Sequence, residues 1–244
     1  MSARLLRLLV LAPAFGAAGC ATTAGDPRDP LEGYNRAMFA VNDVVDEALF
    51  KPVARAYKAV APAPLRGMVR NFFANLEDPL IGANNMLQGK FLDGWTDWAR
   101  FAFNTVFGVL GINDVASEMG LEKHNEDFGQ TFGRWGAGDG PYLVLPFFGA
   151  STLRDTGGLA LDWHFAPLAE ARPIALRNSL YTLYFVNTRA ELLEASRILE
   201  QAALDRYIFQ RDAYFQRRRS LIYDGSPPRE REEEVNDKPD STVK

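Results

Sequence analysis

The chain has 244 residues, of which 47% are hydrophobic and 24% are charged, and its formal net charge is −4. This composition is typical of a folded domain with a sizeable core, and it excludes a wholly disordered chain. The negative net charge argues against nucleic acid as a partner, because phosphate binding needs a dense basic surface. The single cysteine excludes an internal disulfide.

Residues 1–19 have the pattern of a secretory signal peptide. Arg4 and Arg7 precede the apolar run LLVLAPAFGAA, which is too short for a stable transmembrane anchor. The residues AAGC, ending at Cys20, resemble a bacterial lipobox, although Ala17 stands where leucine is usual. The alternative is an ordinary signal peptide with a chance cysteine near its end. We predict that cleavage leaves Cys20 as a lipidated first residue. The next residue is Ala21, where an aspartate would resemble a signal for retention in the inner membrane. We therefore predict that the chain goes to the outer membrane.

A tether over residues 20–28 leads into a predicted folded domain over residues 29–224. Asp29 is the expected N-cap of a helix with Pro30 in its first turn, and Glu32 completes a pattern like a capping box. We expect this helix to end near Lys51-Pro52. Its apolar stripe contains Leu31, Tyr34, Met38, Val41, Val45 and Leu49.

Three further helical stretches are predicted before residue 110. The first runs from about Leu65 to Leu76, the second begins at Asp78-Pro79, and the third covers residues 91–108. One face of the third carries Phe91, Trp95, Trp98 and Ala102, and the other carries Asp93, Asp97, Arg100 and Asn104.

Residues 124–150 change character. Glycines at 129, 133, 136, 138 and 140 are expected to preclude a regular helix, whereas YLVLPFF at 142–148 is apolar and broken by proline. We predict a long structured loop or hairpin, which at this length is usually functional. Helices are expected again over 151–165, around 172–186 and from Thr188 to about Tyr223. The tail, residues 225–244, is charged and is predicted to be disordered.

The chain lacks the usual motifs of catalysis and metal binding. His124 and His164 belong to no HExxH pattern, and GASTL around Ser151 lacks the second glycine of a nucleophile elbow. We therefore predict no catalytic residue, no metal ligand, no cofactor and no enzymatic activity. No segment after Cys20 offers the roughly 18 consecutive apolar residues of a spanning helix.

Several stretches resemble the MlaA/VacJ family of outer-membrane phospholipid-transport lipoproteins. They are DPLEGYNRAMFAVN at 29–42, FFANLEDP at 72–79, NNMLQGK at 84–90 and, most specifically, DFGQTFGRWGAGDGPYLVLPFFGASTLRD at 127–155. The resemblance implies an all-α fold in which amphipathic helices form a ring around a central channel in the outer membrane. It also implies a trimeric porin as neighbour, and passage of phospholipids from the outer leaflet to the periplasmic carrier MlaC, which maintains lipid asymmetry. The implied location is the outer membrane, on the periplasmic side, anchored through Cys20.

The resemblance suggests roles for three groups of residues, each with a plainer alternative. A channel or gate loop would contain Gly133, Gly136, Gly138, Gly140 and Tyr142. The alternative is a fixed turn that needs the positive φ that glycine adopts easily.

The second group would border the channel or a mobile plug on the first helix, and it consists of Met38, Phe39 and Val41. Ordinary core packing is the alternative. Trp95 and Trp98 form the third group, as aromatic side chains at the membrane interface or, alternatively, in the core.

Two other functions compete with transport. A phospholipase would lose activity on mutation of one serine or histidine, and a structural scaffold bound to a porin would leave lipid asymmetry intact when deleted. The resemblance favours transport, although a shared fold does not by itself establish a function.

Overall fold

The computed structural model describes residues 26–228. The signal peptide, Cys20, most of the tether and most of the charged tail lie outside the described residues. The elements of the described chain are α2 (Glu32–Val45), the π-helical segment η3 (Asp46–Phe50), α3 (Lys51–Val60), α4 (Ala63–Leu87), α5 (Phe91–Val106), α6 (Val115–Glu118), α7 (Phe128–Arg134), β1 (Tyr142–Leu145), β2 (Gly149–Thr152), α8 (Leu153–Phe165), the 3₁₀ segment η4 (Pro167–Glu170), α9 (Ile174–Ala202) and α10 (Arg206–Ile222).

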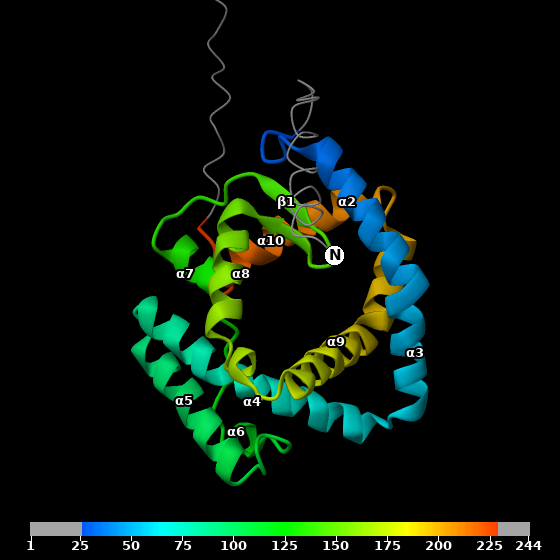
Figure 1. The fold of residues 1–244 in the computed structure, drawn as a ribbon. Coiled ribbons are helices and arrows are strands. Elements are labelled where there is room, and N and C mark those ends of the chain that lie inside the picture. The colour runs from blue at the N-terminus through cyan, green and yellow to red at the C-terminus, as the bar shows by residue number, and fades with distance from the viewer. Residues whose placement is uncertain (1–25, 229–244) are drawn as a thin grey trace, which may run out of the picture.

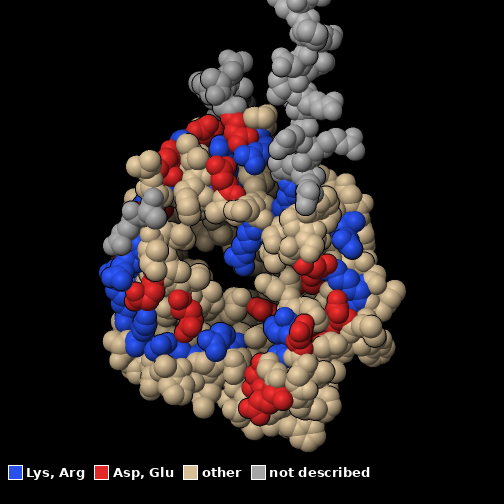
Figure 2. Space-filling view, turned by 180° about the vertical axis from the view of Figure 1, so that it is seen from behind, with Lys and Arg blue, Asp and Glu red and all other residues tan. Residues whose placement is uncertain are grey.

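The helices form a ring around a central opening (Figure 1). The β1–β2 hairpin, α8 and α9 border the opening, whereas α5 and α6 lie on the outer side of α4. The space-filling view shows that the middle of the molecule is still hollow when side chains are drawn (Figure 2). The expected all-α, ring-like fold with a glycine-rich loop or hairpin is therefore confirmed.

The first helix does not end at Lys51-Pro52, as predicted, but continues to Val60. Just before Pro52, the Lys51 N–H bonds to the Asp46 carbonyl, five residues back, in a wider π-helical turn. A proline ring in an α-helix would clash with the carbonyl four residues earlier, and the wider turn relieves this clash. Asp29 is also not the N-cap: Leu31 occupies that position and makes no side-chain cap, and Asp29 is buried.

Two other boundaries differ from prediction. Helix α4 runs without a break through Pro79, and Asp78 is a buried partner of Lys123 and not a cap. Helix α9 is likewise continuous across Val186–Thr188. The chain breaks instead before α10, where the Asp205 carboxylate accepts hydrogen bonds from the backbone N–H groups of Tyr207 and Ile208 at 2.9 and 3.1 Å.

The glycine-rich segment contains a helix that the sequence analysis excluded. Asp127 caps α7, and Gly129 and Gly133 both lie inside that helix. A Cβ atom on Gly158 of α8 would lie 2.3 Å from the Gly129 nitrogen. The absence of a side chain at these two glycines allows α7 and α8 to pack closely, and neither glycine forms a turn. The hairpin prediction is confirmed, with Tyr142 opposite Thr152 and Leu145 opposite Gly149.

Polar side chains fill much of the interior. Among the described residues, ten of the buried side chains are hydrophobic and eighteen are polar or charged. On α5, Asp97, Arg100 and Asn104 are buried, while Trp95 is 62% exposed. A surface helix of a water-soluble domain buries its apolar face and exposes its polar face, and α5 does the reverse. Large exposed apolar patches mark sites of contact with a membrane or another protein. Within residues 26–228, no helix combines the length and the apolar character needed to cross a bilayer.

Candidate functional site

The central opening and the hairpin beside it form the candidate site. Two asparagines of α2 hold the outer edge of β1. Asn35 donates to the Tyr142 carbonyl at 2.9 Å and accepts from the Val144 N–H at 2.8 Å. Asn42 makes the same pair of bonds near the hairpin turn, donating to the Leu145 carbonyl at 2.9 Å and accepting from the Phe147 N–H at 2.8 Å.

The spacing of these two asparagines matches the strand. Seven residues of α-helix rise roughly 10.5 Å, and the three residues of β1 from the Tyr142 carbonyl to the Leu145 carbonyl span roughly 10 Å. Helix α2 therefore takes the place of a third strand and fixes the hairpin to the start of the ring.

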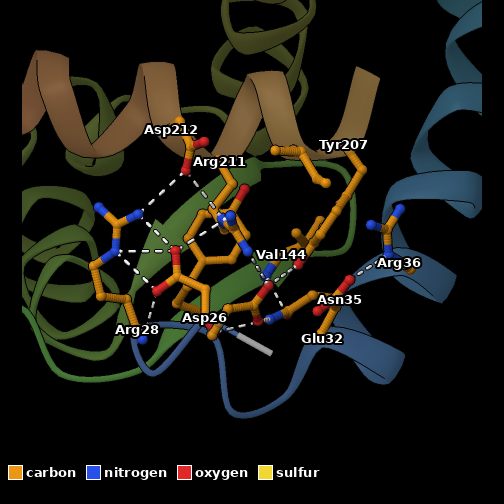
Figure 3. Close-up of polar contacts among 12 residues, drawn as sticks. Asp26, Arg28, Glu32, Asn35, Arg36, Val144, Tyr207, Arg211 and Asp212 are labelled. Atoms are coloured by element: carbon orange, nitrogen blue, oxygen red, sulfur yellow. Dashed lines mark hydrogen bonds and ion pairs between the residues drawn. The ribbon is translucent and has the colours of Figure 1, made fainter. Parts of the chain in front are cut away.

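Charged residues around this contact bind the N-terminal segment to α10 (Figure 3). The buried Asp29 carboxylate accepts from Asn35 at 2.8 Å and from the Tyr207 hydroxyl, and it lies 3.4 Å from Arg211. Arg211 also pairs with Asp26 at 3.2 Å. The N-terminal segment is thus held between α2 and α10.

Three predicted site residues meet in the hydrophobic cluster beneath the hairpin. Tyr142, Val144 and Tyr207 form the buried part of the cluster, and Met38 and Phe39 pack against it. Val41, predicted with Met38 and Phe39, is 45% exposed. Tyr142 lies in β1 and is fully buried, and its role in a channel or gate loop stays a prediction.

The four predicted gate glycines occupy three different environments. Gly133 belongs to α7, where an added Cβ would lie 2.8 Å from Ile222, and Gly140 has a φ of +68° and lies against Leu153. Gly136 and Gly138 have open space where a Cβ would lie. The segment around these two glycines faces α10 across a hollow of about 1460 Å³.

Aromatic rings connect the three elements around the opening. Phe148 at the hairpin turn meets Trp163 of α8 edge to face, with ring centroids 5.1 Å apart. Trp163 stacks on Tyr181 of α9, with centroids 6.1 Å apart and planes 15° apart. Phe148 and Trp163 are both more than half exposed. These aromatic side chains form an apolar contact that joins the hairpin turn to α8 and α9.

One face of α9, a helix that borders the opening, lines a hollow of about 440 Å³. Its lining mixes polar with aliphatic side chains: Asn178, Ser179, Thr182, Leu183 and Val186. The Ser179 and Thr182 hydroxyls each donate to a backbone carbonyl four residues back, at 2.9 Å. This face therefore offers both hydrogen-bonding groups and hydrocarbon.

A charged network fixes α7, α8 and α10 beside the opening. Arg218 donates to both oxygens of Asp127, at 2.6 and 2.9 Å, and to Asp155 at 2.9 Å. Burial alone would raise the pKa of Asp127, but the hydrogen bonds and charge of Arg218, together with hydrogen bonds from Gln130, outweigh burial and hold that pKa below its usual value. Asp155 also pairs with Arg154 at 2.9 Å.

Asp162 lies next to Trp163 on α8, and among the described residues no cation forms an ion pair with it. Its carboxylate accepts the Phe128 N–H at 3.1 Å, and burial raises its pKa to about 7. Asp162 therefore titrates near neutral pH within one residue of the aromatic contact.

The predicted interface aromatics lie apart from the opening, on the outer side of the ring. Trp95 and Trp98 on α5 meet edge to face with centroids 5.2 Å apart and are 62% and 38% exposed. The Trp98 indole N–H donates to the Pro79 carbonyl at 3.1 Å, so α5 is joined to α4 at the proline. Their role at a membrane stays a prediction.

Sequence reasoning missed Asn35, Asn42 and Arg218. The seven-residue spacing of the asparagines places them on one face of the first helix, and that regularity was the available signal. Arg218 lies between two other arginines and gave no such signal.

Comparisons with known proteins agree on one family. The model of the family "MlaA lipoprotein" matches residues 27–221. The "Intermembrane phospholipid transport system lipoprotein MlaA" of Escherichia coli (strain K12) is 40% identical over 206 residues, 82% of this chain and 81% of the relative. The Haemophilus influenzae protein of the same name is 30% identical over 236 residues, 89% of this chain and 90% of the relative.

A solved structure has the same fold. It is described as "Structural basis for maintenance of bacterial outer membrane lipid asymmetry", and it superposes with a TM-score of 0.71 at 37% identity. The superposition covers 80% of this chain and 98% of the solved chain.

Proposed function

The chain belongs to the MlaA lipoprotein family, and from this we propose that it passes phospholipids passively from the outer leaflet of the outer membrane to a periplasmic carrier of the MlaC type. The proposed result is maintained lipid asymmetry. In this proposal Cys20 carries the lipid anchor on the periplasmic side, and a trimeric porin is the neighbour in the membrane.

The need for such a protein follows from the chemistry of its cargo. Moving the roughly 30 methylenes of a two-chain lipid into water costs about 25 kcal/mol at ~0.8 kcal/mol each. Spontaneous transfer is therefore slow. A conduit must offer an apolar wall to the acyl chains and polar groups to the headgroup, and it needs no covalent step.

One observation carries the proposal: a hollow ring whose bordering helix α9 presents a mixed face. Thr182 and Asn178 offer polar groups, and Leu183 and Val186 offer hydrocarbon. The aromatic contact of Phe148 with Trp163 adds apolar surface between the hairpin and α8. Such a face suits an amphipathic cargo better than a purely polar or purely apolar one.

Surface-exposed phospholipid in cells that lack the protein tests the proposal. Deletion should raise it, and the wild-type gene should reverse the rise, whereas Cys20→Ala should not. No rise, in a strain without redundant pathways, would refute the proposal and favour a structural scaffold.

A matched pair of substitutions on α9 tests the path itself. Thr182→Trp fills the mixed face, whereas Thr188→Trp places the same ring six residues on, about 240° further round the helix. Both threonines are exposed. We expect surface phospholipid to rise with Thr182→Trp and to stay at the wild-type level with Thr188→Trp, at equal protein levels. Equal behaviour of the two variants would exclude this face as the path.

A further inference from the structure

A basic groove lies between α3 and α9, apart from the central opening. It has a volume of about 340 Å³, and its charged lining residues are Lys51, Arg55, Lys58, Glu194, Arg197 and Glu200. None of its described lining residues belongs to the hairpin or to α8. Figure 2 shows basic side chains continuing from this region as an arc along the rim over α3 and α4.

The floor of the groove is electrically balanced. Lys51 is only 4% exposed, and its ammonium group donates to Glu47 and, at 2.8 Å, to Glu200. The charge of this buried lysine is therefore already compensated by two carboxylates.

The mouth of the groove is not balanced. Lys58 and Arg197 share the single carboxylate of Glu194, at 3.6 and 3.5 Å, and that side chain is 65% exposed. Among the described residues, Arg55 has no carboxylate within ion-pair distance, so three cations face one anion. Long, exposed ion pairs contribute little, so a stronger anion can displace Glu194.

This set of donors suits a phosphate group. The planar guanidinium groups of Arg55 and Arg197 can each bind two oxygens, and the Lys58 ammonium adds a point charge. A phosphodiester carries one negative charge, which the excess at the mouth accommodates.

Exposed apolar side chains on the other face of α3 and at the start of α4 indicate where that phosphate comes from. Val53 and Val60 of α3 are 42% and 84% exposed, and Leu65 and Met68 at the start of α4 are 48% and 41% exposed. Helix α3 thus carries basic residues on one face and, about half a turn round the helix, an exposed aliphatic stripe on the other, as helices at a bilayer surface do. We infer that the groove binds the phosphate of an anionic phospholipid headgroup while the aliphatic stripe faces hydrocarbon. This inference holds whether or not the central opening conducts lipid.

The test is a titration of the full-length protein, purified in a non-ionic detergent. The probes are short-chain phosphatidylglycerol, short-chain phosphatidylcholine and inorganic phosphate, and binding is measured by calorimetry. We expect phosphatidylglycerol to bind most tightly, with an affinity that falls as salt rises. The double variant Arg55→Ala/Lys58→Ala should weaken its binding roughly tenfold or more, because two charge-assisted contacts are lost.

A matched control separates the groove from general charge effects. Arg172→Ala removes an exposed arginine that precedes α9, at the end of that helix opposite to Arg197, and it should leave binding unchanged. The inference is overturned if the double variant and Arg172→Ala bind alike, or if inorganic phosphate or phosphatidylcholine binds as tightly as phosphatidylglycerol. Thr182→Trp should bind phosphatidylglycerol normally, so failure of transport and failure of this site give different results.

Discussion

Asn35→Ala should destabilise the protein more than any other single truncation in α2. Asn35 is fully buried and makes three hydrogen bonds, to Asp29 at 2.8 Å, to the Tyr142 carbonyl at 2.9 Å and from the Val144 N–H at 2.8 Å. Alanine leaves the two backbone groups buried without partners, at about 1–3 kcal/mol each. The expected loss in the free energy of unfolding is therefore about 2–6 kcal/mol. For a domain of this size, at about 2–4 °C per kcal/mol, that lowers Tm by roughly 4–24 °C.

The assay is thermal and urea unfolding of the full-length protein in one detergent, followed by circular dichroism. Asn42→Ala is the matched control, because the same two kinds of backbone bond are made at a half-buried position near the hairpin turn. Water can reach the groups that it frees, so its cost should be about 0.5–1.5 kcal/mol. If Asn35→Ala loses less than about 1 kcal/mol, or no more than Asn42→Ala, then α2 does not act as the partner of β1.

Three further predictions concern α8 and the glycine-rich segment. Burial raises the folded-state pKa of Asp162 to about 7, so folding favours the protonated acid, and the stability that this protonation contributes is lost as pH rises through 7. The free energy of unfolding of Asp162→Asn minus that of wild type, measured with urea, should therefore increase between about pH 4 and pH 7 and stay constant above about pH 7. A difference that does not change with pH would contradict this. Gly158→Ala should destabilise the protein by about 2–3 kcal/mol, because the added Cβ would lie 2.3 Å from the Gly129 nitrogen. Gly157→Ala has open space at the Cβ position and should stabilise the protein by up to about 1 kcal/mol. Equal effects of the two variants in thermal unfolding would show that the α7–α8 contact is loose. Gly138→Val should raise surface phospholipid without lowering Tm, because the position has open space and no positive φ, and unchanged transport would remove the gate role.

The periodicity of the sequence predicted most helices but not their connections. Leu65–Leu76 and the stretch after Asp78 are one helix, because Pro79 lies where tertiary contacts, including the Trp98 indole bond to its carbonyl, outweigh the local cost of proline. The sequence predicts helix breakers at the glycines of α7, because a glycine that allows close helix packing and a glycine that allows a turn look alike in a single sequence.

The two faces of α5 were assigned correctly, but the pattern could not tell which face points inward. An amphipathic helix has the same periodicity whether water or hydrocarbon surrounds it, and here Asp97 and Arg100 are the buried ones. For the candidate site, the sequence singled out the right segments. It did not reveal the contact of Phe148 with Trp163 and Tyr181, since that contact depends on how three distant elements meet.

The largely polar interior has a consequence for the heat capacity of unfolding. Exposure of apolar surface raises this quantity and exposure of polar surface lowers it. With ten hydrophobic against eighteen polar or charged buried residues in the described chain, the change per residue should fall below the roughly 12–15 cal/mol/K typical of globular proteins. The curve of stability against temperature is then shallow, so cooling weakens this ring less than it weakens a protein of equal length with an apolar core.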